Sequence, residues 1–62
     1  EDSGIYYNIS CIYAKQGRVG ESVAWLKKAV EKGFNDWSLL RSDPDLMGIR
    51  ETPYFKAILE TR

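Results

Sequence analysis

The spacing of apolar residues in the first half of the chain predicts two helices joined by a short turn. One helical stripe occupies the i, i+3, i+4 and i+7 positions of residues 3–16; it contains Tyr6, Ile9, Ser10 and Tyr13, and Ile5 and Ile12 widen it. A broader stripe runs through residues 19–32; it contains Val19, Ser22, Val23, Leu26, Ala29 and Val30, with Trp25 at its flank. Gly17 and Gly33 follow these two segments, as glycines that stop helices do. Because only Gly17 and Arg18 fill the turn, we expect an antiparallel hairpin that begins at a Ser3 cap.

Capping side chains and prolines divide the second half of the chain. Asn35 or Asp36 can cap a short helix that carries Trp37, Leu39 and Leu40. Asp43 and Thr52 each precede a proline, which is typical of a cap followed by the first helical position. These boundaries predict a helical turn over residues 44–49 and a last helix over residues 53–61, with Phe55, Ile58 and Leu59 facing inward. No segment alternates with a period of two, so the predicted fold class is all-α.

The order of large and small residues in the predicted hairpin resembles one tetratricopeptide repeat. The family pattern has an aromatic residue, an apolar–small pair and a tyrosine on the first helix, then small and large residues on the second. The corresponding residues here are Tyr6, Ile9, Ser10, Tyr13, Gly17, Ser22, Leu26 and Ala29. The resemblance implies a helix–turn–helix repeat over residues 3–36. The repeat normally closes with a proline, and this chain has Phe34 at that position.

Residues 37–62 resemble the capping element that ends some tetratricopeptide arrays. Such ends carry a Gly–aromatic junction, a Trp or Tyr, an Asp-Pro-Asp-Leu turn and a Pro-x-Phe helix, and the chain has these in order. The resemblance implies an α-solenoid fragment, the last repeat of an array plus its C-terminal cap, held by Phe34, Trp37 and Phe55. Because one repeat rarely stands alone, we expect upstream repeats, a multiprotein complex or self-association.

Composition narrows the function classes. The 62 residues carry nine basic and nine acidic side chains, so a formal net charge of zero argues against a nucleic-acid partner. No apolar run reaches about 18 residues, so we expect no membrane insertion. The chain has no histidine and one cysteine, which removes imidazole-based catalysis and an internal disulfide. We expect no metal site, no cofactor, and a soluble, intracellular protein.

Two candidate chemical sites have the wrong residues around them. Asp43, Asp45 and Gly48 fit positions one, three and six of a calcium loop, but Met47 and Tyr54 stand where the fifth and twelfth ligands belong. Helix capping is the better explanation of the two aspartates. Cys11 has no histidine partner for nucleophilic catalysis, so we expect it to be a small packing residue or a passive surface thiol. The sequence therefore predicts no catalytic residue and a protein that is not an enzyme.

The candidate binding site is implied by the family resemblance. In such arrays the first helix of each repeat lines the concave side where peptides bind. The corresponding strip here contains Tyr7, Cys11, Ala14 and Lys15, with Asn8 and Arg18 nearby. Chaperone-binding members hold a carboxylate there with Lys, Arg and Asn, and Tyr7 and Cys11 replace much of that set, so an aromatic contact through Tyr7 fits better. The alternative is that the repeat only terminates the array and contacts nothing.

The expected function is a non-catalytic protein–protein interaction or scaffold module that binds a protein partner or peptide segment. Two other classes remain open. The chain can be a docking appendage of a larger enzyme, or it can be a structural subunit or assembly factor in a multiprotein complex.

Overall fold

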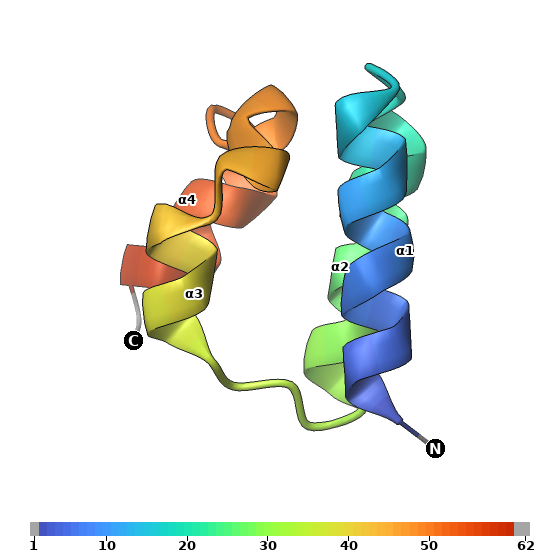
Figure 1. The fold of residues 1–62 in the computed structure, drawn as a ribbon. Coiled ribbons are helices and arrows are strands. Elements are labelled where there is room, and N and C mark those ends of the chain that lie inside the picture. The colour runs from blue at the N-terminus through green and yellow to red at the C-terminus, as the bar shows by residue number, and fades with distance from the viewer. Residues whose placement is uncertain (1, 61–62) are drawn as a thin grey trace.

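The computed structural model describes residues 2–60, and every regular element within them is a helix. The elements are α1 (Ser3–Lys15), α2 (Val19–Glu31), α3 (Trp37–Ser42), the 3₁₀ helix η1 (Pro44–Ile49) and α4 (Pro53–Glu60). Figure 1 shows α1 and α2 side by side as a hairpin, with α3, η1 and α4 grouped as a second half across from them. The all-α prediction is confirmed for these residues. Thr61, the last residue of the predicted final helix, lies outside them.

Helix starts are set by side chains that bind free backbone amides. The Asp2 carboxylate accepts a hydrogen bond from the Gly4 amide at 2.8 Å, so the prediction that Ser3 caps α1 is wrong by one residue. Asp36 accepts from the Leu39 amide at 3.1 Å, and Asp43 accepts from the Asp45 amide at 2.9 Å. The capping role predicted for Asp36 and Asp43 is therefore confirmed.

Two glycines end the helices of the hairpin. Gly17 has φ of 77° and Gly33 has φ of 106°, a left-handed conformation that side-chain-bearing residues rarely adopt. After Gly33 the backbone leaves α2 and crosses to α3 through residues 34–36, the extended stretch at the bottom of Figure 1. The predicted helix stops at these two positions are confirmed.

Two buried serines hold α1 against α2. Ser10 and Ser22 are both fully buried, and each hydroxyl donates to the other residue's carbonyl oxygen at 2.7 Å. Side chains this small let the two backbones approach closely, and the reciprocal bonds satisfy both buried hydroxyls. The Ser10–Ser22 contact therefore fixes where the two helices cross.

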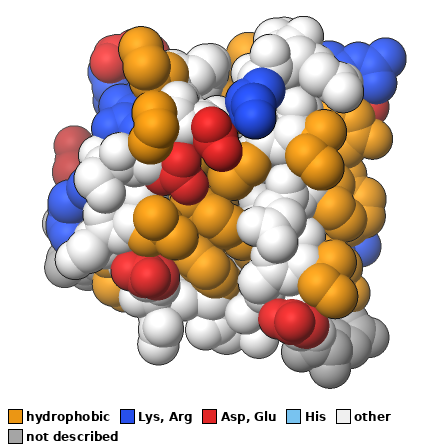
Figure 2. Space-filling view, viewed as in Figure 1, with side chains coloured by type: hydrophobic (Ala, Val, Ile, Leu, Met, Phe, Trp, Pro, Cys, Tyr) orange, Lys and Arg blue, Asp and Glu red, His pale blue; other side chains and the backbone are white. Residues whose placement is uncertain are grey.

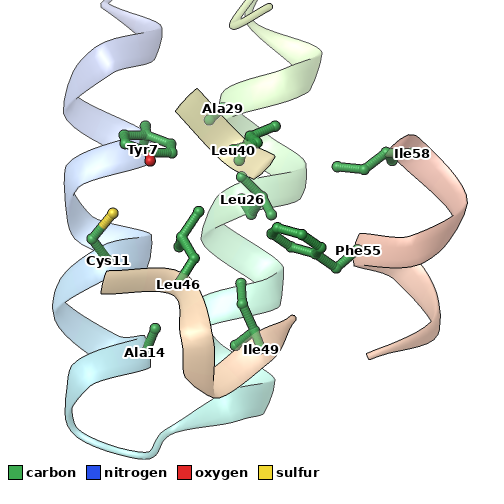
Figure 3. Close-up of a cluster of buried hydrophobic side chains, with 10 residues drawn as sticks. All are labelled: Tyr7, Cys11, Ala14, Leu26, Ala29, Leu40, Leu46, Ile49, Phe55 and Ile58. Carbon is green, nitrogen blue, oxygen red and sulfur yellow. The ribbon is translucent and has the colours of Figure 1, made fainter. Parts of the chain in front are cut away.

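The hydrophobic core lies between the hairpin and the second half. Its members are Tyr7, Cys11, Ala14, Leu26, Ala29, Leu40, Leu46, Ile49, Phe55 and Ile58. Figure 3 shows these side chains converging from α1 and α2 on one side and from α3, η1 and α4 on the other. Of the three residues expected to hold the cap, Phe55 is buried, whereas Phe34 and Trp37 are partly buried against this core. The second half thus completes a core that the hairpin alone leaves open.

No helix within residues 2–60 has the length and apolar character needed to cross a membrane.

Candidate functional site: two faces of the first helix

The predicted binding strip on α1, here called the inner face, is Tyr7, Cys11, Ala14 and Lys15. Tyr7 is 5% exposed, Cys11 7% and Ala14 5%, whereas Lys15 is exposed. In Figure 3 the first three side chains point toward the second half of the chain and lie next to Leu46. The chain's own residues therefore occupy the position in which a peptide partner was expected.

Residues 43–49 close the inner face through specific contacts. The Tyr7 hydroxyl donates a hydrogen bond to the Asp43 carboxylate, and the Cys11 Sγ lies 4.0 Å from the same carboxylate. The Lys15 ammonium lies 4.0 Å from Asp45. On the other side of Tyr7, the Phe34 ring stacks on the Tyr7 ring with centroids 4.5 Å apart and planes at 8°.

Gly48 shows how closely η1 approaches α1. A Cβ atom at position 48 would lie 2.8 Å from the carbonyl oxygen of Ala14. Backbone therefore meets backbone at this point, and no ligand side chain fits between them. Of the four residues of the inner face, the structure leaves Lys15 at the surface.

Burial raises the pKa values of two side chains of the inner face, Tyr7 and Cys11. Burial, and then the hydrogen bond to Asp43, raise the pKa of Tyr7 well above its usual range. Burial also raises the pKa of the Cys11 thiol. A thiol held in its protonated form is a weak nucleophile, so these pKa shifts support packing as the role of Cys11.

Three potential metal ligands meet at the inner face. One ligand atom each from Cys11, Asp43 and Asp45 lies within 4.8 Å of the others. These groups already have partners in the fold: Asp43 accepts from Tyr7 and from the Asp45 amide, and Asp45 faces Lys15. Helix capping and closure of the inner face therefore account for both carboxylates.

The raised pKa of Tyr7 predicts a loss of stability at high pH. A neutral Tyr7 is favoured in the folded state, so its contribution is present below about pH 10, where unfolded tyrosine titrates, and is lost as the pH rises further. We expect the urea-unfolding free energy to fall as the pH rises above about 10, and Tyr7→Phe to remove part of this fall. Tyr7→Phe itself should cost about 1 kcal/mol at pH 8. Equal pH profiles for Tyr7→Phe and the control Tyr13→Phe would contradict this assignment.

The opposite side of α1 carries the largest uncovered apolar side chains of this helix. Ile5 is 55% exposed and Ile12 is 54% exposed, and Ile9 lies between them, partly buried. Figure 2 shows apolar side chains in a column along the right-hand edge, over α1. We call the surface formed by Ile5, Ile9, Ile12, Tyr6, Tyr13 and Trp25 the outer face. The sequence pattern placed the isoleucines and tyrosines on the apolar stripe of the first helix and Trp25 at the flank of the second stripe. It did not show which side of the helix is exposed.

Two cations lie over the aromatic rings of the outer face. Tyr6 stacks on Trp25 with centroids 5.8 Å apart. The Lys28 ammonium lies 5.1 Å from the Trp25 centroid and 5.8 Å from the Tyr6 centroid. The Arg18 guanidinium lies 5.8 Å from the centroid of Tyr13. Tyr, Trp and Arg are enriched in protein–protein interfaces.

A surface hollow of about 350 Å³ lies on the second half of the chain. Its lining residues are Arg41, Arg50, Glu51, Phe55, Lys56, Leu59 and Glu60. The Arg50 guanidinium donates to the carbonyl oxygens of Arg41 at 2.5 Å and Asp43 at 2.6 Å. Arg50 therefore ties the end of α3 to η1 and is committed to the fold.

The chain aligns with part of a longer protein. The chain is 35% identical over 60 residues to a chloroplast protein of Arabidopsis thaliana, an alignment that covers 97% of this chain and 18% of that protein. The chain thus spans less than a fifth of the relative's length. No family model matches the chain, and no solved structure gives a significant match.

Proposed function

We propose that this chain is a non-catalytic protein-interaction module, the last tetratricopeptide repeat of a helical array together with its C-terminal cap. The observation that carries the proposal is the asymmetry of α1. Its inner face is sealed by residues 43–49, whereas its outer face leaves Ile5 and Ile12 more than half exposed. The terminal unit of a helical stack needs one side whose apolar residues are covered and one apolar side that packs against the neighbouring unit.

Three further features support the proposal. The small residues at the crossing of α1 and α2 are Ser10 and Ser22, two of the positions that carry the family resemblance. The second half supplies Leu40, Leu46 and Phe55 to cover the hairpin, as a cap does. The alignment with the longer relative covers nearly all of the chain, so hairpin and cap align together as one unit.

The sealed inner face changes the proposed mechanism of binding. A peptide seated on Tyr7, Cys11 and Ala14 would have to displace Leu46 and Ile49, which are fully buried in the same core. A peptide bound there would have to offset the loss of these buried contacts in addition to the usual costs of association. We therefore assign the docking role to the outer face.

Removing the two exposed isoleucines tests this function. In the natural protein, Ile5→Ser combined with Ile12→Ser should raise hydrogen-exchange rates of the α1 amides tenfold or more, because each isoleucine loses burial worth roughly 1 kcal/mol against its neighbour. Isoleucine and serine have similar helix propensities, so the helix itself changes little.

The matched control is Met47→Ser, which alters a side chain that is 71% exposed on η1. We expect this variant to leave the exchange of α1 unchanged. Unchanged exchange in the double isoleucine variant as well would mean that the outer face docks on nothing, and the proposed function would fail.

A further inference from the structure

We infer that the outer face receives an amphipathic helix of the same polypeptide, and that this helix carries carboxylates along its flank nearest α2. The inference rests on the proposed function and names the chemistry of the neighbour. Its basis is the juxtaposition of an isoleucine ridge on α1 with two cations held over aromatic rings beside it.

The shape of the outer face fits a helix. Ile5, Ile9 and Ile12 are spaced by four and three residues, so they form one ridge along α1. This ridge is about 10 Å long, because seven residues rise about 1.5 Å each. Such ridges pack into the grooves between the side-chain rows of a second helix. A helix also brings no unpaired backbone groups to an apolar surface, since its amides bond within the helix.

The charges beside the ridge define the flank of that helix. Lys28 lies over Trp25 and Tyr6, and among the residues that the structure describes no ion pair involves Lys28. A neighbour seated on the isoleucines would remove water from this ammonium. Desolvating a cation is costly unless an opposite charge meets it. Arg18 lies 5.8 Å from the Tyr13 centroid on the same side, but it already pairs with Glu21 at 3.5 Å. Lys28 is therefore the cation for which a carboxylate of the neighbour is expected.

The size of the face favours a neighbour within the same polypeptide. α1 has 13 residues and is therefore about 20 Å long, with a diameter near 10 Å. Its footprint is well below the roughly 800 Å² per partner of stable complexes between separate proteins. A tethered helix acts at an effective concentration near millimolar, so a small apolar face can hold it. The length of the Arabidopsis relative, of which the aligned unit is 18%, supports a tethered neighbour.

Photo-crosslinking from one end of the isoleucine ridge identifies the neighbour. In the natural protein, Ile12→p-benzoylphenylalanine should crosslink within the same polypeptide, to a helix that has Asp or Glu within one turn of the crosslinked residue. Met47→p-benzoylphenylalanine is the matched control and should not crosslink to that helix. A crosslink from position 12 to another protein, to a second copy, or to a basic or non-helical segment would overturn this inference and leave the proposed function standing. No crosslink from position 12 would overturn both.

Charge reversal tests the acidic flank separately. In the natural protein, Lys28→Glu should raise the hydrogen-exchange rates of the α1 amides roughly tenfold, and Lys28→Gln should have a smaller effect. Lys56→Glu is the control, because the Lys56 ammonium lies 3.0 Å from Glu51 in the second half of the chain, and it should leave α1 unchanged. Equal exchange in Lys28→Glu and wild type would overturn the acidic flank.

Discussion

Phe55→Ala is expected to destabilise the protein by about 3–5 kcal/mol, the largest effect of any single substitution proposed here. Phe55 is 1% exposed, and in Figure 3 its ring reaches from α4 into the core near Leu26 and Ile49. Truncation removes its apolar contacts and leaves a cavity between the two halves. Stability of about 0.05–0.15 kcal/mol per residue is typical, so this loss is comparable to the whole margin of a domain this small. Urea unfolding followed by circular dichroism measures it.

The control for Phe55→Ala is Met47→Ala. Met47 is 71% exposed, so its truncation should change the unfolding free energy by less than about 0.5 kcal/mol. Similar losses in the two variants would contradict the position of α4 against the core.

Gly48→Ala is expected to cost about 1–3 kcal/mol even though it adds a single methyl group. The added Cβ would lie 2.8 Å from the Ala14 carbonyl oxygen, so η1 would have to move away from α1. The matched control is Gly20→Ala in α2, where nothing lies within 4 Å of the added atom. That control should stabilise the protein by about 0.5–1 kcal/mol, because alanine is the better helix former.

The two glycine substitutions are thus expected to change the stability of the protein in opposite directions. Thermal unfolding of both proteins under one condition measures the difference. A Gly48→Ala protein as stable as the Gly20→Ala protein would show that η1 does not rest on the backbone of α1.

Local chemistry made much of the fold predictable from the sequence. Gly17 and Gly33 stop the helices because the backbone needs a positive φ at both positions, and glycine adopts it without a steric cost. Asp43 before Pro44 predicted the start of η1, since a capping carboxylate and a residue without an amide hydrogen suit a first helical turn. The error at the first cap, Ser3 instead of Asp2, arose because either side chain can accept an amide hydrogen bond.

The orientation of α1 was not predictable in the same way. Its sequence is apolar on several sides, so the periodicity identifies a helix without stating which side faces its own core. The second half of the chain decides this by folding onto Tyr7, Cys11 and Ala14, and that choice depends on contacts far apart in sequence. Ile5 and Ile12 are left outside, although they are the more apolar residues.

The sequence also did not show which residue of α3 is buried most deeply. Trp37 was expected to hold the cap together with Phe34 and Phe55, and it packs against the core, partly buried, from the first position of α3. Leu40, one turn later, is the residue that α3 buries completely.

Thiol labelling tests the central claim most directly, since the chain has one cysteine. The claim is that the second half of the chain closes the inner face of α1. Cys11 in the native protein should react with a maleimide at least about a hundredfold more slowly than the cysteine of a Met47→Cys, Cys11→Ser variant, because Cys11 labelling requires opening of the fold whereas position 47 is 71% exposed. Equal labelling rates at positions 11 and 47 would show that the inner face is open and would contradict the account.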